Sequence, residues 1–440
     1  MLIDFTISNF RSIKDPQTIS FEATDDTHLE EYYVVNKGGF RLLKMATIIG
    51  ANASGKSNML QAYMLFLLLM RVPCESKTDR ILYDRFAFDN ESAAQDSTIG
   101  VNFICAGFHY RYHIVFNNEL VFEENLQRRE LGSSELKLIF VRRTDRITKH
   151  SVVSLEDDYL KYQKEFEDLQ RNLLHNRTVF GAYQKTNVDI PWMKEVADWM
   201  VSYLLPIVTT AEQGLPQYTS NQIFAGKISK EQVAAFLRKA DVGIDDFSVK
   251  NEDIPISVEY ASALLADSRV DVSVKEQVKN KTAISTARVK MMHQGNKGHY
   301  ELDFKEESRG TQRYYEMAGV LLTLINSSHI VAIDELEYAM HPDLYEHFMA
   351  TFLTNAKESQ IICTTHMREF LTDRNLFRDD SVWIAQKDSC GASEFYSMAD
   401  FDKKELQQIG SRYNAYKSGR LGGVPLLGDT YVEPHKLQEL

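Results

Sequence analysis

Alternating apolar and polar residues predict that the first third of the chain is rich in β-strands. Two such stretches near the N-terminus flank a turn-like Asn9-Phe10-Arg11-Ser12. Three more runs follow, at residues 98–105, 109–116 and 120–123, with Ala106-Gly107 and Asn117-Asn118 between them. Short polar or glycine-containing breaks of this kind connect neighbouring antiparallel strands. We therefore expect an antiparallel β-layer in this part of the fold.

Continuous apolar runs predict a second, mainly parallel sheet. Residues 45–49, 330–333 and 360–365 have the length and the unbroken apolar character of strands that are buried on both faces. The first run is followed at 59–70 by an apolar helical stretch, which Gln61 interrupts and which is too short to span a bilayer. We interpret it as a buried crossover helix. Together the patterns predict an α/β fold with a mixed central sheet beside the antiparallel β-layer.

The pattern changes to helical spacing from about residue 155. Apolar residues then recur at steps of three and four, as in Met193, Val196, Ala197, Met200, Val201 and Leu204. No heptad repeat is sustained, which argues against a long coiled-coil arm. We predict that residues 1–154 and 300–440 form the two parts of one α/β unit and that residues 155–299 are a mainly helical insertion.

Residues 50–57 read Gly-Ala-Asn-Ala-Ser-Gly-Lys-Ser and stand between a predicted strand and a predicted helix. This is the context of a P-loop, whose backbone N–H groups surround the β-phosphate of a nucleoside triphosphate. Lys56 would reach the β- and γ-phosphate oxygens, and the Ser57 hydroxyl would hold Mg²⁺. The other residues expected to bind the nucleotide are Gly50, Asn52, Ala53, Ser54, Gly55 and Asn58.

Two acidic residues, Asp334 and Glu335, end the apolar run at 330–333. This is the form of a Walker B segment, in which Asp334 helps to hold Mg²⁺ and Glu335 points at the attacking water. The next apolar run ends at His366, where an imidazole could donate a hydrogen bond to the γ-phosphate. We therefore predict Lys56, Glu335 and His366 as catalytic residues.

The segment Glu307-Ser308-Arg309-Gly310-Thr311 opens a predicted helix. A helix start that is rich in serine and glycine is a good anion site. Ser308 is equally an ordinary N-cap residue. The sequence leaves both interpretations open.

The order of these motifs, GANASGKS, ESRGTQR, VAIDELE and TTH, resembles the P-loop, signature, Walker B and switch histidine of ABC-type ATPases. The opening MLIDFTISNFRSIKD, the segment DELEYAMHPDL, the segment DDSVWIAQKDSCGASEFYSMADF and the tail YKSGRLGGVP look like the AAA15 family of ATPases. That group contains bacterial abortive-infection and restriction-linked ATPases and the ATPase partner of PARIS-type anti-phage defence. The resemblance covers roughly residues 1–125 and 300–425 and leaves the middle of the chain uncovered.

The resemblance implies an ABC-type ATPase head that uses ATP and Mg²⁺. Two heads would close face to face, and each P-loop would sandwich ATP against Ser308 and Gly310 of the other subunit. The resemblance therefore implies a homodimer and leaves a higher homo-oligomer open. Arg11 matches the position from which SMC- and Rad50-like heads reach an ATP phosphate. Two departures stand out. Arg85-Phe86-Ala87-Phe88-Asp89 occupies the place of a Q-loop glutamine, and the signature is only Ser308-Arg309-Gly310-Thr311.

The charge of the chain limits its partners. A formal net charge of −12 argues against a general nucleic-acid coat. Two segments are nevertheless basic: residues 126–150 hold seven basic and three acidic residues, and residues 269–297 hold seven and two.

Four scattered cysteines fit a reducing cytosol, and the N-terminus lacks the basic region of a signal peptide. We expect a cytoplasmic protein without a membrane partner.

The leading functional hypothesis is an ATP-driven switch with slow hydrolysis in anti-phage defence. The insertion would sense a trigger or hold a separate effector, for which a nuclease encoded alongside is one candidate. An alternative is a DNA-repair or chromosome-maintenance ATPase that grips DNA with the two basic segments. A third hypothesis is an assembly scaffold in which ATP is structural and rarely turned over.

Overall fold

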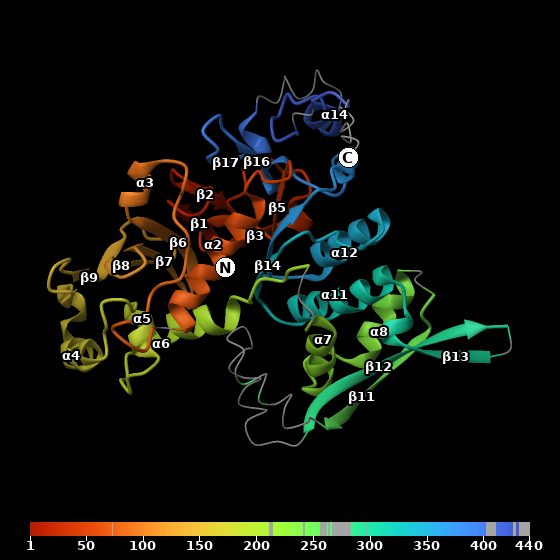
Figure 1. Cartoon of the computed structure of the whole chain (residues 1–440), viewed down its shortest axis with the longest axis horizontal. Coiled ribbons are helices and arrows are strands. Elements are labelled where there is room, and N and C mark those ends of the chain that lie inside the picture. The colour runs from red at the N-terminus through yellow and green to blue at the C-terminus, as the bar shows by residue number, and fades with distance from the viewer. Residues whose placement is uncertain are drawn as a thin grey trace, which may run out of the picture.

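The computed structural model describes residues 1–72, 74–210, 214–240, 243–255, 262, 265, 283–296, 298–401, 411–425 and 428–430. Figure 1 shows an antiparallel sheet on one side of the molecule, a central sheet in the middle and a smaller sheet, β11 to β13, on the opposite side.

The central sheet carries the predicted nucleotide motifs at one edge. Its order is β14 (Ile330–Ile333), β15 (Gln360–Thr365), β5 (Met45–Gly50), β16 (Val382–Lys387) and β17 (Ser393–Ser397). The first four strands are parallel, and β17 is antiparallel to β16. Every residue of β14, β15 and β5 is buried, which explains their continuous apolar sequences. Because parallel strands end at the same edge, the segments after these three strands meet there.

The antiparallel layer has seven strands. Their order is β10 (Ser151–Leu155), β9 (Lys137–Thr144), β8 (Val121–Glu130), β7 (Phe108–Phe116), β6 (Ser97–Cys105), β1 (Leu2–Ser8) and β2 (Gln17–Ser20). The structure thus confirms the predicted α/β fold, with a mixed central sheet beside an antiparallel β-layer. It adds β9, which lies in the basic segment, and β10, which follows that segment; neither was predicted as a strand.

Helix α2 (Lys56–Arg71) lies between the two sheets, as predicted for the crossover helix. It packs against β1 of the antiparallel layer and against β5, β14 and β15 of the central sheet. Aromatic contacts join α2 to the antiparallel layer: the Phe66 ring lies 6.3 Å from both the Phe5 and the Tyr112 rings. Burial on both sides explains why this helix is apolar nearly all round.

Residues 155–299 contain the predicted helices and also a sheet that was not predicted. The helices are α4 (Gln163–Arg171), α5 (Val179–Tyr183), α6 (Pro191–Asp198), α7 (Leu215–Phe224) and α8 (Lys230–Lys239). The three-stranded sheet is formed by β11 (Asp246–Pro255), β12 (Ala283–Gly295) and β13 (Gly298–Asp303). The division of the chain at residues 154 and 299 stays a prediction.

Helices α7 and α8 pack on α11 (Arg309–Asn326), which in turn packs on α12 (Pro342–Asn355). The approach of α7 to α11 is close: a Cβ built on Gly319 would lie 2.2 Å from Thr219 Oγ1 and 2.8 Å from Thr219 Cα. The Phe236 ring of α8 stacks on Tyr314 of α11 at 4.6 Å. These contacts fix the middle of the chain to the helix that begins at the predicted signature.

The remaining elements are short. They are α1 (Glu30–Tyr33), β3 (Val34–Lys37), β4 (Phe40–Leu43), α3 (Asn90–Ala94), the 3-10 helices η1 (Asp157–Tyr162), η3 (Phe304–Glu306), η4 (Glu369–Thr372), η5 (Asp379–Ser381) and η6 (Met398–Asp400), the π-helix η2 (Trp199–Tyr203) and α14 (Arg412–Lys417). Within the described residues, no helix combines the length and the apolar character that crossing a membrane requires.

Candidate active site

The loop between β5 and α2 has the tight backbone of a P-loop. A Cβ built on Gly50 would lie 2.3 Å from the Ala385 carbonyl oxygen, so only glycine fits beside β16. Gly55 has a φ of 106°, and a Cβ there would meet the Ser393 hydroxyl at 2.1 Å. Ala53 also adopts a left-handed conformation, with a φ of 63°. The two glycines of the motif therefore serve the close approach of neighbouring chain segments as well as the turn.

The Lys56 ammonium group lies across its own loop. Nζ donates hydrogen bonds to the carbonyl oxygens of Gly50 at 2.8 Å and Ala51 at 3.0 Å, and it lies 3.4 Å from His366 Nδ1. Burial lowers the pKa of Lys56 to about 8, against the opposing effect of nearby carboxylates, of which Glu337 acts most strongly. A buried amine with exchangeable carbonyl partners is suited to bind phosphate oxygens.

The proposed metal ligands meet across the edge of the central sheet. The Ser57 hydroxyl, in the first turn of α2, donates a hydrogen bond of 3.0 Å to Asp334 Oδ1, directly after β14. The Thr364 hydroxyl donates to the same oxygen at 2.6 Å. A hydroxyl and a carboxylate are thus brought to one point.

Glu335 adopts a left-handed backbone conformation with a φ of 50°. Its N–H donates to Thr364 Oγ1 at 2.8 Å, and its carboxylate Oε1 lies 3.5 Å from His366 Nε2. The His366 ring therefore lies between Lys56 on one side and Glu335 on the other. Glu337 fixes the backbone there, because its Oε1 accepts a 2.6 Å hydrogen bond from the His366 N–H.

These residues fit a nucleoside triphosphate with Mg²⁺. The Ser54 hydroxyl is buried and has no hydrogen-bond partner in the described structure, so a donor remains for a phosphate oxygen. The first N–H groups of α2 have no acceptor within the helix. Mg²⁺ takes oxygen ligands and usually keeps one or two protein ligands beside phosphates and water. No group of three or more His, Cys, Asp or Glu side chains able to hold a metal occurs among the described residues, and such a site does not need one.

Ser308 and Gly310 lie at the start of α11 and are not brought to the P-loop by any hydrogen bond in the described structure. Ser308 is the N-cap residue, and its Oγ accepts a 3.1 Å hydrogen bond from the Thr311 N–H. The Ser308 side chain is otherwise exposed. Gly310 approaches the segment after Glu335, because a Cβ on it would lie 3.1 Å from the Ala339 carbonyl oxygen. Ser308 therefore caps α11, and its anion-binding role stays a prediction.

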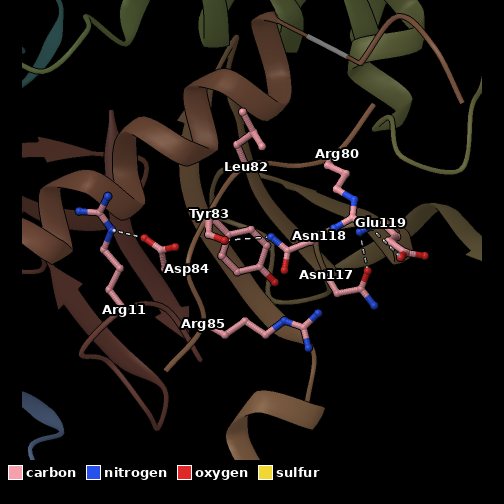
Figure 2. Close-up of a pocket in the computed structure, with 9 residues that line it drawn as sticks. All are labelled: Arg11, Arg80, Leu82, Tyr83, Asp84, Arg85, Asn117, Asn118 and Glu119. Carbon is pink, nitrogen blue, oxygen red and sulfur yellow. Dashed lines mark hydrogen bonds and ion pairs between the residues drawn. The ribbon is translucent and has the colours of Figure 1, made fainter. Parts of the chain in front are cut away.

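Arg11 lies in a cavity of about 630 Å³ beside the turn after β1 (Figure 2). It has a φ of 50°, its N–H donates to the Asp84 carbonyl oxygen at 2.8 Å, and its Nε lies 3.9 Å from Asp84 Oδ2. Figure 2 shows Arg11 and Asp84 at one end of the cavity and Arg80 at the other. The next residue, Ser12, accepts a 2.7 Å hydrogen bond from the Asn58 side chain in α2. Arg11 thus directly precedes a residue that contacts the P-loop helix, and its own side chain pairs with Asp84.

No hydrogen bond among the described residues joins segment 85–89 to the P-loop. This segment occupies the place of a Q-loop glutamine in the sequence. Phe86 is buried and packs edge to face on Phe88. Asp89 caps α3 and pairs with Lys14 at 2.8 Å. This segment is structural in the described contacts.

Three residues at the site were not assigned a role from the sequence: Ser12, Thr364 and Glu337. Thr364 and Glu337 belong to the TTH and DELE motifs, in which only the histidine and the first two acids were singled out. The sequence does hold a signal for Thr364, because it is a hydroxyl residue near the end of a buried, mainly apolar strand, and a buried hydroxyl needs a hydrogen-bond partner.

Neighbouring acids compensate most of the basic segment at 126–150. Arg142 is buried 3.9 Å from Glu124. The other pairs are Lys137 with Asp158, Arg143 with Glu123, Arg146 with Asp96 and Lys149 with Glu119. Most of the second basic segment, 269–297, lies outside the described residues; within the described part, Arg288 pairs with Asp303 and Lys290 with Glu301. Among the described residues of the two segments, these pairs offset most of the positive charge.

Several solved structures are similar to this chain over most of its length. One is the SMC head bound to the C-terminal winged-helix domain of ScpA, with a TM-score of 0.43, 12% identity and coverage of 92% of this chain and 99% of that one. Others are the SMC head domain from Thermotoga maritima (TM-score 0.37, 12% identity, 90% and 98% coverage) and a Pyrococcus furiosus Smc head complex with ScpA (TM-score 0.37, 11% identity, 93% and 98% coverage).

The sequence comparison is more decisive. No curated protein matches the chain. Residues 45–371, well over half of it, match the family described as "AAA domain, putative AbiEii toxin, Type IV TA system". The match begins at the first residue of β5 and ends beyond His366, so it includes both nucleotide motifs. The chain belongs to this AAA-domain family of P-loop ATPases.

Proposed function

We propose that this protein hydrolyses ATP at the edge of the central sheet where β5, β14 and β15 end. The observation that carries the proposal is the hydrogen bond between Ser57 and Asp334, with Glu335 and His366 beside it. A hydroxyl, an acidic metal ligand and a carboxylate base at one point are the parts that phosphoryl transfer to water requires. A bound Mg²⁺ would neutralise charge on the transferred phosphoryl group.

The residues then have distinct roles. Lys56 binds the β- and γ-phosphate oxygens in exchange for the Gly50 and Ala51 carbonyl oxygens. Ser57 and Asp334 hold the metal. Glu335 orients the attacking water and accepts its proton, and His366 places a hydrogen-bond donor between Lys56 and Glu335.

The active unit in this proposal is a homodimer of heads. Ser308 is exposed, and its described hydrogen bonds stay within α11, so it is available to a second subunit. Ser308 and Gly310 of one head would close on the nucleotide bound by the P-loop of the other, at the positive end of the α11 dipole. Arg11 would leave Asp84 to reach a phosphate. Assemblies larger than the dimer are compatible with this arrangement.

The biological role that we infer is an ATP-driven switch in anti-phage defence, which holds or releases a separate effector. Support comes from the family, whose description names an AbiEii toxin and a Type IV TA system, and from the resemblance to abortive-infection ATPases. The effector could be a nuclease. The paired charges of residues 126–150 speak against the DNA-clamp alternative.

Affinity purification from the native host tests this role. The tagged Glu335→Gln protein is isolated with ATP present, and the eluate is examined by mass spectrometry and nucleic-acid extraction. We expect a stoichiometric partner protein and little nucleic acid. Duplex DNA without a protein partner would contradict the switch and favour the clamp. If Glu335→Gln changes neither assembly nor activity, ATP is structural and the scaffold hypothesis holds.

A further inference from the structure

Thr364, the fifth residue of β15, contacts the three consecutive residues that directly follow β14. Its hydroxyl donates to Asp334 Oδ1 at 2.6 Å and accepts from the Glu335 N–H at 2.8 Å. Its carbonyl oxygen accepts from the Leu336 N–H at 3.1 Å. One fully buried residue thus holds the proposed metal ligand, the backbone of the proposed base and the residue after it.

The direction of these hydrogen bonds is fixed by chemistry. A backbone N–H can only donate, so the Thr364 oxygen must accept from Glu335. Its single proton is then free for the carboxylate of Asp334, and a hydrogen bond to an ionised acceptor is stronger than a neutral one. The hydroxyl therefore sets the position of one Asp334 oxygen and one Glu335 backbone atom at the same time.

The position of Thr364 follows from the sheet register. The parallel pairing of β14 with β15 ends at Ile333 and Cys363, so Thr364 stands where the ladder would continue. There the chain turns away with the left-handed conformation of Glu335. The Thr364 hydroxyl replaces the next ladder contact and stabilises this turn. The following residue, Thr365, bonds to the Met367 N–H instead.

We infer that Thr364 is a positioning residue that aligns Asp334 for Mg²⁺ and Glu335 for the attacking water. The role of Thr364 in aligning Glu335 rests on the proposed ATP hydrolysis. Its role in aligning Asp334 concerns metal binding and rests on the contact between Thr364 and Asp334. Groups that orient a metal ligand from behind typically change metal affinity or activity roughly 10- to 100-fold when they are removed.

The test compares Thr364→Val, which keeps the shape but removes the hydroxyl, with Thr364→Ser, which keeps the hydroxyl. The matched control is Thr47→Val, since Thr47 is a buried threonine in the adjacent strand and pairs with Cys363. The first readout is the Mg²⁺ concentration that half-saturates binding of a non-hydrolysable ATP analogue. We expect it to rise roughly 10-fold or more in Thr364→Val, and far less in Thr364→Ser and Thr47→Val.

The second readout is kcat, measured at saturating ATP and Mg²⁺, with thermal unfolding as the check on folding. We expect kcat to fall in Thr364→Val while the metal-free affinity for the analogue stays unchanged. Should Thr364→Val not fold, Thr364→Ala carries the same prediction. An unchanged Mg²⁺ requirement in the valine variant overturns the inference. A wild-type protein that binds the analogue with Mg²⁺ but never hydrolyses ATP contradicts the proposed hydrolysis instead, and the Mg²⁺ readout still decides the role of Thr364.

Discussion

Ser57 Oγ lies 3.0 Å from Asp334 Oδ1, although 277 positions separate the two residues in the sequence. The contact exists because β5 and β14 are parallel strands of one sheet, with β15 between them, and both end at the same edge. It joins the two halves of the proposed active site.

Lys56→Ala should abolish ATP binding and leave the fold intact. Lys56 is proposed to contact the β- and the γ-phosphate, and each charge-assisted contact contributes roughly 1.5–3 kcal/mol, so losing both lowers the affinity by more than about a hundredfold. The measurement is isothermal titration with ATP and Mg²⁺, together with circular dichroism.

Lys44→Ala is the matched control for that variant. Lys44 is also buried and also donates to two carbonyl oxygens, those of Leu353 and Ala356, but it lies away from the P-loop. We expect Lys44→Ala to lower the thermal stability without lowering ATP affinity. Normal ATP affinity in Lys56→Ala would refute the P-loop assignment.

The ATP affinity should fall as pH rises above about 8. Burial lowers the pKa of Lys56 to about 8 from an ordinary value of 10.5, so the folded protein without ATP loses this proton as the pH rises through about 8. Phosphate oxygens favour the charged amine, and binding above pH 8 must therefore take up a proton, which weakens the affinity by up to about tenfold per pH unit. Titrations between pH 7.5 and 9.5 measure the slope.

Lys56→Arg supplies the comparison for the pH dependence, because a guanidinium group stays protonated over this range. The affinity of this variant should be weaker overall but nearly independent of pH. An equal slope in both proteins would assign the pH dependence to a group other than Lys56.

Ser308→Asp should block hydrolysis through the partner subunit. Aspartate still caps α11, so the helix is kept, but the added negative charge would face the phosphates of the nucleotide in the other head. Ser308→Asn caps equally well without the charge and should lose far less activity. Phosphate release by each variant gives the comparison.

Mixing the Ser308→Asp and Lys56→Ala proteins tests whether the site is shared between subunits. Each is inactive alone, but a mixed dimer contains one intact site, formed by the P-loop of the Ser308→Asp subunit and Ser308 of the Lys56→Ala subunit. The mixture should then recover activity, up to about half of the wild-type value, because the symmetric interface carries two sites and only one is intact. No recovery would contradict the shared site.

Gly319→Ala should destabilise the packing of α7 on α11. A Cβ there meets the Thr219 backbone as well as its side chain, so the two helices must move apart. Overpacking of this kind costs roughly 1–3 kcal/mol. Gly214→Ala is the control, since a Cβ at Gly214 has no atom within 4 Å. Thermal unfolding should separate the two variants clearly, and equal melting temperatures would contradict the close approach.

The sequence predicts the parts of the site that depend on one continuous segment. The loop at 50–57 and the acidic pair at 334–335 could be found because each follows an unbroken apolar strand. The contacts of Thr364 and Glu337 could not, because they join segments about 30 residues apart and depend on the register of β14 against β15. Likewise, the pairing of Arg11 with Asp84 depends on how the segment after α2 returns to β1.

The sheet of β11, β12 and β13 was missed for a different reason. Among the described side chains of this sheet, the buried ones are Phe247 of β11 and Val289 and Met291 of β12, and every side chain of β13 is exposed or half-buried. So few buried positions give too little apolar alternation to reveal the strands. In β1, by contrast, the buried residues follow the apolar pattern, and the strand was predicted.

The proposed switch requires two heads to close on each other when ATP is bound. The mass of the Glu335→Gln protein in solution tests this closure directly. Removing a general base slows hydrolysis roughly 10²- to 10⁴-fold, so bound ATP should persist. Light scattering with ATP and Mg²⁺ should then give twice the mass found with ADP, and adding Ser308→Asp should restore the lower mass. A mass that is the same with ATP, with ADP and without nucleotide would contradict the proposed switch.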